Sequence, residues 1–305
     1  MATDHGQLTT DKGHSFSMKV AITGAAGLFG HGLVSAFAAR HDVVPLTRAE
    51  ADITNQDAVR GVLEKIRPDV VVHPAGSPDL DFCEANPAAG YAMNVHGTRF
   101  IVEAARELGA AVAYISTDAV FDGQKQTPYV ESDPPHPTTV YGRTKWRAEQ
   151  AVANLPHHWI FRVSVLFGPG KTNFVEKVLR KVAAREEPVV AADQMGSATY
   201  TLDAGQKIME VVEGRRYGLY HLSNSGPCSR LELARHAAEL AGLDASRVIG
   251  KPAEEMGRRA RRLKYAVMEM RALKEAGFEL PRSWQDALAH YVRSLALSAP
   301  TLMGA

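Results

Sequence analysis

Tyr141 and Lys145 lie four residues apart in the stretch YGRTK, and their types and spacing suggest proton-transfer chemistry. On a helix this spacing puts both side chains on one face. A free phenol has a pKa of about 10, and a neighbouring ammonium group favours the phenolate. Tyr141 is therefore suited to donate and accept a proton near neutral pH. Exposed surface pairs often share this spacing, so the assignment needs support from other motifs.

A second candidate group stands in the stretch STDAVFDG, which follows an apolar run expected to form a buried strand over 110–117. Ligands bind at the carboxyl ends of parallel strands, so we expect Thr117 to hold a substrate oxygen beside the tyrosine. Asp118 either touches the substrate or caps a turn. Ala119 cannot act as an acid or a base.

A glycine-rich stretch, ITGAAGLFG, indicates a dinucleotide-binding loop. Gly24, Gly27 and Gly30 follow an expected strand over 19–23 and lead into an expected helix over 28–40. Such glycines allow a tight turn and a close approach to a pyrophosphate at a helix N-terminus. Glycines also occur in ordinary strand-to-helix turns, but here strand, loop and helix follow in the required order.

The end of the second expected strand, over 42–47, bears on the choice of cofactor. Rossmann proteins often keep an acid there for the ribose hydroxyls, whereas an arginine can pair with a 2′-phosphate. Thr47 and Arg48 occupy this position, which favours NADPH over NADH unless Arg48 is only a solvated surface charge. The predicted cofactor-binding residues are Gly24, Ala26, Gly27, Leu28, Phe29, Gly30, Arg48, Asp52, Ile53, Ala75, Gly76, Ser116, Tyr141 and Lys145.

The order of elements predicts an α/β fold with a Rossmann-type doubly wound parallel sheet and a smaller C-terminal α/β substrate lobe. Short apolar strands alternate with helices from residue 18 onward, which is typical of a parallel sheet covered on both faces. We expect a flexible tail over 1–17, a dinucleotide-binding domain over 18–166, and a mainly substrate-binding lobe over 167–305. Some later segments are expected to return to the first domain.

The bulk composition limits the partners. The net charge of +1 gives no electrostatic case for nucleic acid or a membrane surface. Two separated cysteines are consistent with a reduced cytoplasmic location. The twelve histidines show no clustered ligand spacing, so we predict no metal site.

These motifs resemble the extended short-chain dehydrogenase/reductase family: TGAAGLFG, STDAVFDG, VYGRTK and MNVHGT. DITN, LDFCEANP, PYVESDPPHPTTVYGRTK and DQMGSAT further resemble its dTDP-4-dehydrorhamnose reductase branch. The resemblance covers most of residues 18–295. It implies that Thr117, Tyr141 and Lys145 are catalytic and that Lys145 also binds the nicotinamide ribose. It further implies hydride transfer to a sugar C4 ketone, a proton from Tyr141, and, as in many family members, a homodimer.

The sequence also departs from this branch. Val165 and Ala119 stand where the branch has aromatic residues, and Ala198 replaces a proline. Related dehydratases are expected to carry a second acid at position 119, so elimination of water is not expected here. These departures predict conserved chemistry on an altered substrate.

One basic cluster, GRRARRLK over 257–264, has two interpretations. The resemblance implies an arginine near a nucleotide-sugar diphosphate, a role that suits a guanidinium group. A solvated loop or helix end is the alternative. The predicted substrate-binding residues are Asp118, Val165 and Arg258.

Three functions remain open. The leading hypothesis is NAD(P)H-dependent reduction of a 4-keto group on a nucleotide-linked deoxysugar, or of another carbonyl substrate. The second is a nucleotide-sugar epimerase with tightly held NAD. The third is a non-catalytic dinucleotide-binding protein, because the regulatory subunit of methionine adenosyltransferase resembles the same family.

Overall fold

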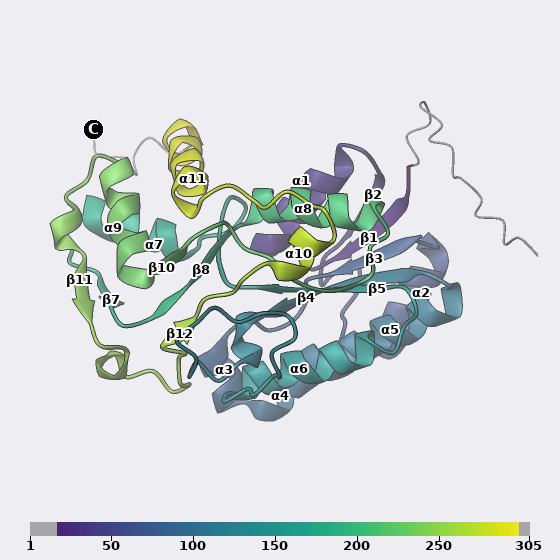
Figure 1. The fold of residues 1–305 in the computed structure, drawn as a ribbon. Coiled ribbons are helices and arrows are strands. Elements are labelled where there is room, and N and C mark those ends of the chain that lie inside the picture. The colour runs from purple at the N-terminus through teal and green to yellow at the C-terminus, as the bar shows by residue number, and fades with distance from the viewer. Residues whose placement is uncertain (1–16, 299–305) are drawn as a thin grey trace, which may run out of the picture.

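A parallel six-stranded sheet forms the centre of the molecule in a computed structural model that describes residues 17–298 (Figure 1). The strand order is β2-β1-β3-β4-β5-β9, and every neighbouring pair is parallel. The strands are β1 (Lys19–Thr23), β2 (Asp42–Leu46), β3 (Val70–His73), β4 (Ala111–Thr117), β5 (His158–Val163) and β9 (Gly218–His221). Every residue of β3 and β4 is buried, because helices cover both faces. The predicted Rossmann-type sheet is confirmed. Most of the predicted tail, residues 1–16, lies outside the described residues.

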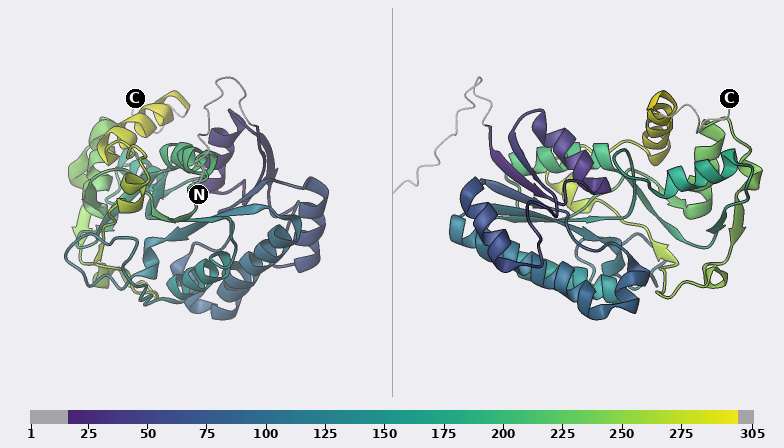
Figure 2. Two further views of the ribbon diagram at one scale, coloured as in Figure 1. Left: turned by 45° about the vertical axis from the view of Figure 1, so that its right-hand side comes forward. Right: turned by 180° about the vertical axis from the view of Figure 1, so that it is seen from behind.

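Two helical layers enclose this sheet, as Figure 2 shows from behind. One layer contains α1 (Leu28–Ala38), α8 (Thr201–Glu213) and α10 (Arg271–Glu275), and its core includes Phe37, Ile208 and Leu273. The other contains α2 (Gln56–Ile66), α5 (Gly97–Leu108) and α6 (Val140–Val152), and its core includes Leu63 and Ile101. The chain enters α5 through α3 (Leu80–Ala85), α4 (Pro87–Tyr91) and a π-helical turn at Ala92–His96.

The chain returns to the sheet after residue 167. Helix α8 packs on α1 so closely that a Cβ on Gly32 would lie 2.4 Å from the Thr201 carbonyl oxygen. Strand β9 then joins the edge of the sheet beside β5. The second half of the chain therefore contributes to both parts of the molecule.

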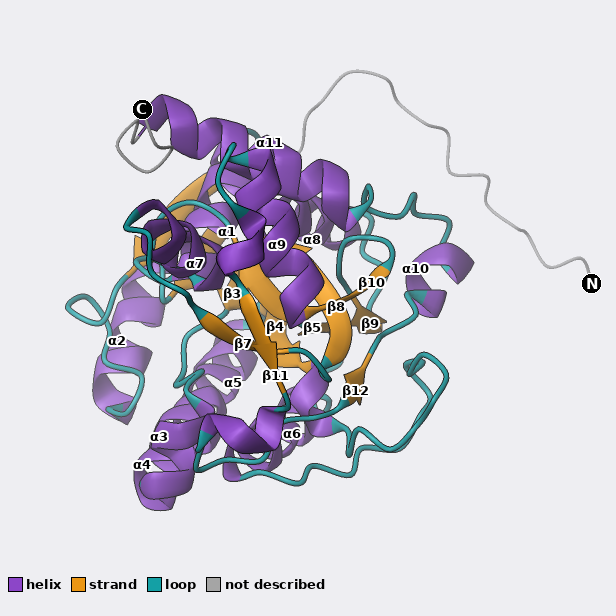
Figure 3. Ribbon diagram, turned by 90° about the vertical axis from the view of Figure 1, so that its left-hand side faces the viewer, coloured by secondary structure: helices purple, strands orange, loops and turns teal. Residues whose placement is uncertain are grey.

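The C-terminal part is a smaller α/β unit built around β8 (Met195–Tyr200). This strand pairs in parallel with β6 (Val165–Phe167) and β12 (Tyr265–Ala266), and antiparallel with β10 (Pro227–Ser229). A separate parallel pair is formed by β7 (Val189–Ala191) and β11 (Ile249–Lys251). Figure 3 looks at this unit from the side of its helices, α7 (Phe174–Ala183), α9 (Arg230–Leu240) and α11 (Trp284–Ser298). The smaller C-terminal lobe is thus confirmed as a feature of the fold.

None of the helices in residues 17–298 is long and apolar enough to span a membrane.

Candidate active site

The glycine loop lies between β1 and α1 and has the geometry that close approach of a ligand requires. Gly24 has a φ of +60°, which favours glycine, and its carbonyl oxygen accepts a hydrogen bond from the Gly27 N–H at 2.8 Å. A Cβ on Gly30 would lie only 2.2 Å from the same Gly24 oxygen. No side chain caps the N-terminus of α1. The loop therefore fits a pyrophosphate held by free backbone N–H groups.

The predicted adenosine end lies beside this loop. A cavity of about 400 Å³ is lined by Ala25, Ala26 and Thr47, among others. Arg48 follows Thr47, its side chain is 83% exposed, and it pairs with Asp52 at 3.2 Å. Asp52 also accepts hydrogen bonds from the Thr54 backbone and hydroxyl. The exposed guanidinium remains accessible to a ligand at the end of β2.

The loop after β3 approaches the glycine loop from the neighbouring strand. A Cβ on Gly24 would lie 3.0 Å from the Ala75 Cα. Gly76 has a φ of +153° and passes next to Asn94, whose Oδ1 accepts the Ser77 N–H at 2.7 Å. The Asn94 amide also donates to Thr144 of α6 at 2.9 Å. Asn94 thus connects the cofactor loop with the helix that carries Tyr141.

The start of α6 places Tyr141 near the end of β4. The Thr139 hydroxyl caps the helix by accepting the Gly142 N–H at 3.0 Å. A Cβ on Gly142 would lie 2.1 Å from the Ala119 carbonyl oxygen, so only glycine allows this approach. The helix begins against the turn that follows Thr117.

Burial changes the acidity of both members of the Tyr141–Lys145 pair. It raises the pKa of Tyr141 above 10, and a hydrogen bond with Thr117 partly offsets this rise. It lowers the pKa of Lys145 from 10.5 to about 7, against the attraction of Glu149. The Lys145 ammonium donates to the Ile115 carbonyl at 2.6 Å and lies 4.1 Å from the Tyr114 ring centroid. In the protein without a ligand, the Tyr141 hydroxyl is therefore protonated at neutral pH.

A buried ion pair between Glu149 and Arg162 lies one helical turn beyond Lys145. The sequence motifs did not predict this ion pair. Glu149, one turn further along α6, accepts two hydrogen bonds from Arg162 of β5, at 2.9 and 2.8 Å. The side chains of Glu149 and Arg162 are 6% and 3% exposed. Ser116, a predicted cofactor residue, donates its hydroxyl hydrogen to the same Glu149 carboxylate at 2.5 Å. Ser116 is thus engaged within the protein.

Most of the predicted catalytic and substrate residues meet in a cavity of about 130 Å³ between the sheet and the C-terminal unit, although Lys145 and Arg258 do not line it. Thr117, Asp118, Tyr141 and Val165 all line it, and so does Ala119. Asp118 accepts hydrogen bonds from Thr117 at 3.0 Å and from Ser164 at 2.5 Å. Burial raises the pKa of Asp118. Asp118 does not cap the turn that follows β4. Thr117 caps it instead, because its hydroxyl oxygen accepts the Ala119 N–H at 3.1 Å.

The basic cluster contributes Arg262 to the cavity wall, whereas Arg258 is exposed and outside that wall. Arg262 forms a two-pronged ion pair with Asp81 of α3, with hydrogen bonds of 3.2 and 2.7 Å. Asp81 also accepts the Ala260 N–H at 2.8 Å. The segment over 257–264 is therefore attached to the dinucleotide-binding half.

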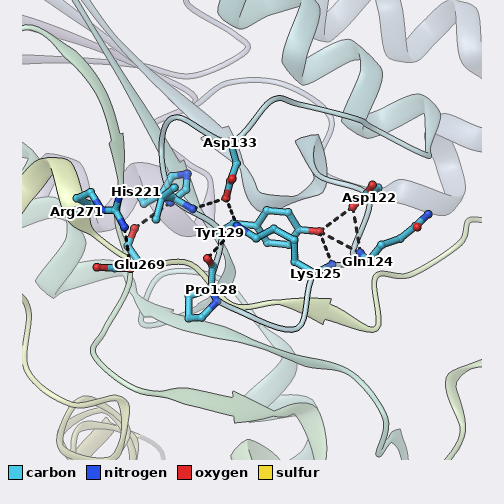
Figure 4. Close-up of polar contacts among 10 residues, drawn as sticks. Asp122, Gln124, Lys125, Pro128, Tyr129, Asp133, His221, Glu269 and Arg271 are labelled. Atoms are coloured by element: carbon cyan, nitrogen blue, oxygen red, sulfur yellow. Dashed lines mark hydrogen bonds and ion pairs between the residues drawn. The ribbon is translucent and has the colours of Figure 1, made fainter.

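The loop over residues 121–133, which follows β4, holds β12 against the cavity. Tyr129 exchanges backbone hydrogen bonds of 2.8 Å with Val267 and Glu269, directly after β12. Its hydroxyl donates to Asp122 at 2.7 Å, and Lys125 pairs with Asp133 at 2.5 Å, as Figure 4 shows. These contacts hold β12 in place, and Ala266 of this strand lines the cavity.

Sequence reasoning missed Arg230, which also lines the cavity. It is the first residue of α9, and no recognised motif surrounds it. Its position depends on the antiparallel pairing of β10 with β8, which brings Ser229 opposite Met195.

One protein family and two named relatives each match most of this chain. The family described as RmlD substrate binding domain matches residues 18–297. The spore coat polysaccharide biosynthesis protein SpsK of Bacillus subtilis strain 168 is 35% identical over 90% of this chain and 97% of its own. The dTDP-4-dehydrorhamnose reductase of Streptomyces griseus is 36% identical over 88% of this chain and 90% of its own.

A solved structure agrees with these matches. The dTDP-4-dehydrorhamnose reductase of Bacillus anthracis, solved in complex with NADP, superposes with a TM-score of 0.88 at 34% identity, covering 92% of this chain and all of that one. The chain is thus homologous to NAD(P)-dependent dTDP-sugar reductases, as the sequence predicted. It belongs to the RmlD substrate binding domain family.

Proposed function

We propose that this protein uses NADPH to reduce the 4-keto group of a nucleotide-linked deoxysugar. The observation that carries the proposal is that Thr117 and Tyr141 line one cavity, with Lys145 one turn further along the same helix. The family relatives named as dTDP-4-dehydrorhamnose reductases support the substrate class.

Each residue of this set has a distinct part in the reaction. The Thr117 hydroxyl orients the substrate carbonyl oxygen next to the Tyr141 hydroxyl. NADPH, when bound, supplies the hydride to the carbonyl carbon. Tyr141 gives its proton to the carbonyl oxygen, which becomes the alcohol.

The pKa directions support Tyr141 as the proton donor. Because burial raises the pKa of Tyr141, its hydroxyl keeps its proton at neutral pH until the substrate accepts it. After transfer, the Lys145 ammonium favours the phenolate. Glu149 raises the pKa of Lys145 against burial and so helps to keep that ammonium charged.

The dinucleotide lies, in this proposal, along the glycine loop, with its adenosine end at the cavity beside Thr47. Arg48 pairs with a 2′-phosphate, which gives the preference for NADPH. Ala75 and Gly76 bound the loop from the side of β3. The NADP bound by the Bacillus anthracis relative supports this choice of cofactor.

The substrate diphosphate lies, in this proposal, near the basic segment over 257–264. Arg262 already belongs to the cavity wall, and Arg258 extends the positive charge outward. Ala119 has no acid or base to eliminate water, so the reaction is a reduction without dehydration.

The direct test measures NADPH oxidation by the pure protein with dTDP-4-dehydro-6-deoxy sugars, beside Tyr141→Phe. We expect turnover in the native protein and a loss of about 100- to 10,000-fold in kcat in the variant. Because Tyr141 is also a predicted cofactor-binding residue, the Kd of the variant for NADPH is measured as well, and kcat is compared at saturating NADPH. Equal turnover by both proteins would exclude Tyr141 as the donor, and no turnover with any of these sugars would contradict the proposal.

A further inference from the structure

The hydroxyl group of Thr117 has a single hydrogen, and its hydrogen bonds show where that hydrogen points. Thr117 donates to Asp118 Oδ1 at 3.0 Å, and Ser164 donates to Asp118 Oδ2 at 2.5 Å. An ionised carboxylate has no hydrogen of its own, so both hydroxyl groups must donate to it. The Thr117 hydrogen therefore stays on Asp118 as long as that carboxylate is ionised.

This arrangement conflicts with the part that Thr117 takes in the proposed reaction. A carbonyl oxygen only accepts hydrogen bonds, so Thr117 can orient the substrate carbonyl only by donating its hydrogen to it. The same hydrogen cannot point at Asp118 and at the carbonyl. The Thr117 oxygen accepts the Ala119 N–H at 3.1 Å and has a second lone pair, which can accept another hydrogen bond.

Protonation of Asp118 removes the conflict without moving a heavy atom. A protonated carboxyl group carries one O–H donor and keeps its capacity to accept. A hydrogen on Asp118 Oδ1 is donated to the second lone pair of Thr117, and Oδ2 still accepts the hydrogen of Ser164. Thr117 then accepts two hydrogen bonds, and its own hydrogen can be donated to the carbonyl.

The surroundings of Asp118 shift its ionisation in the direction that this role requires. Burial raises the pKa of Asp118, against the hydrogen bonds from Ser164 and Thr117 and the charge of Arg230. Arg230 forms no ion pair with Asp118 in the part of the chain that the structure describes. The titratable and charged side chains that line the same cavity are Tyr141 of α6, Cys228 of β10, Arg230 of α9 and Arg262 of the basic segment.

We propose that Asp118 is a positioning residue that acts in its protonated form, by donating to Thr117 and so turning the Thr117 hydroxyl toward the substrate carbonyl. The carboxyl group takes up its proton from water before the reaction and keeps it throughout. Tyr141 remains the donor of the proton that the alcohol receives. This inference rests on the proposed function, because it concerns the same carbonyl group.

The test replaces the acid with an amide of the same shape. In Asp118→Asn, the amide nitrogen can donate to Thr117 and the amide oxygen can accept from Ser164, as in the protonated acid. We expect the variant to keep kcat/KM for a dTDP-4-dehydro-6-deoxy sugar within about threefold of the native value at the acidic end of the pH profile. Asp57→Asn, at an exposed position on α2, is the control and should match the native protein at every pH.

The pH profile separates this role from a purely structural one. The native kcat/KM should fall about tenfold for each pH unit above the pKa of Asp118, because only the protonated form positions Thr117. Asp118→Asn lacks this fall, whereas loss of the charge on Lys145 affects both proteins. The ratio of variant to native kcat/KM should therefore rise with pH. A structural defect would lower this ratio by the same factor at every pH.

An infrared spectrum measures the protonation of Asp118 without turnover. The keto-sugar is bound together with NADP⁺, which has no hydride to give, at the acidic end of the pH profile, and the spectrum of Asp118→Asn is subtracted from that of the native protein. We expect the C=O band of a protonated carboxyl group in the difference, and a carboxylate band alone would overturn the inference.

The kinetic results can also contradict the role of Asp118. A loss of more than about tenfold in kcat/KM at every pH in Asp118→Asn would overturn it, and so would a ratio that falls as the pH rises. Either result, with an active native protein, leaves the reductase proposal intact. A native protein that reduces none of these sugars would instead contradict the proposed function, and this inference with it.

Discussion

Replacing Lys145 with methionine should make the ligand-free protein more stable at low pH while removing activity. The substitution keeps a long, flexible side chain but removes the charge. Burial lowers the pKa of Lys145 from 10.5 to about 7, so the folded protein resists carrying this ammonium. The native lysine therefore lowers the free energy of unfolding at every pH below about 10.5, where Lys145 of the unfolded chain carries a proton.

The size of this effect follows from the pKa change. A fall of about 3.5 in pKa corresponds to about 5 kcal/mol, which is fully present below about pH 7 and is lost as the pH rises toward 10.5. The variant also loses the 2.6 Å hydrogen bond to Ile115, at a cost of about 1–3 kcal/mol at every pH. Lys145→Met should thus gain about 2 kcal/mol or more near pH 6, and that gain should shrink by about 3 kcal/mol between about pH 6 and about pH 9.

The assay is urea unfolding of both proteins without cofactor at several pH values. Lys177→Met, at an exposed position on α7, is the control and should change stability by less than about 0.5 kcal/mol. The reasoning is wrong if Lys145→Met destabilises the protein near pH 6, or if the difference from the native protein does not change with pH.

Three further predictions concern the binding sites. Arg48→Ala should weaken NADPH binding by about 1–3 kcal/mol and leave NADH nearly unchanged, as measured by titration; equal losses would show that Arg48 is not a phosphate ligand. Gly30→Ala should raise the Kd for NADPH about tenfold or more, because its Cβ would lie 2.2 Å from the Gly24 oxygen; unchanged binding by a folded variant would contradict the proposed loop geometry. Asp81→Asn should raise the KM for the sugar nucleotide about two- to fivefold with little change in kcat, because it weakens the partly exposed ion pair that holds Arg262 at the cavity wall. A change confined to kcat would refute this positioning role of Asp81.

The sequence predicted those parts of the fold and site that depend on local patterns. The glycine loop, the buried strands and the Tyr141–Lys145 spacing each involve neighbouring residues, so the pattern alone identified them. The family motifs then indicated that Thr117 lies beside Tyr141, and the structure puts both on one cavity wall. The Rossmann-type fold followed from the alternation of strands and helices.

Contacts between distant segments were harder to predict. Arg230 reaches the cavity because β10 pairs with β8, and the three-residue β10 has no distinctive pattern. Glu149 and Arg162 pair across α6 and β5, although each looks like an ordinary charged residue in the sequence. Helix α8 packs on α1 through Gly32 and Gly205, a close approach that only the folded chain reveals.

The central claim is that this protein delivers a hydride to the C4 ketone of a sugar nucleotide. The most direct test gives the protein NADPH deuterated at the transferable position together with a dTDP-4-dehydro-6-deoxy sugar, and locates the label in the product by mass spectrometry. The account predicts deuterium at C4 of the sugar and an equal amount of NADPH consumed. An epimerised or unchanged sugar without label, and without net consumption of NADPH, would contradict it.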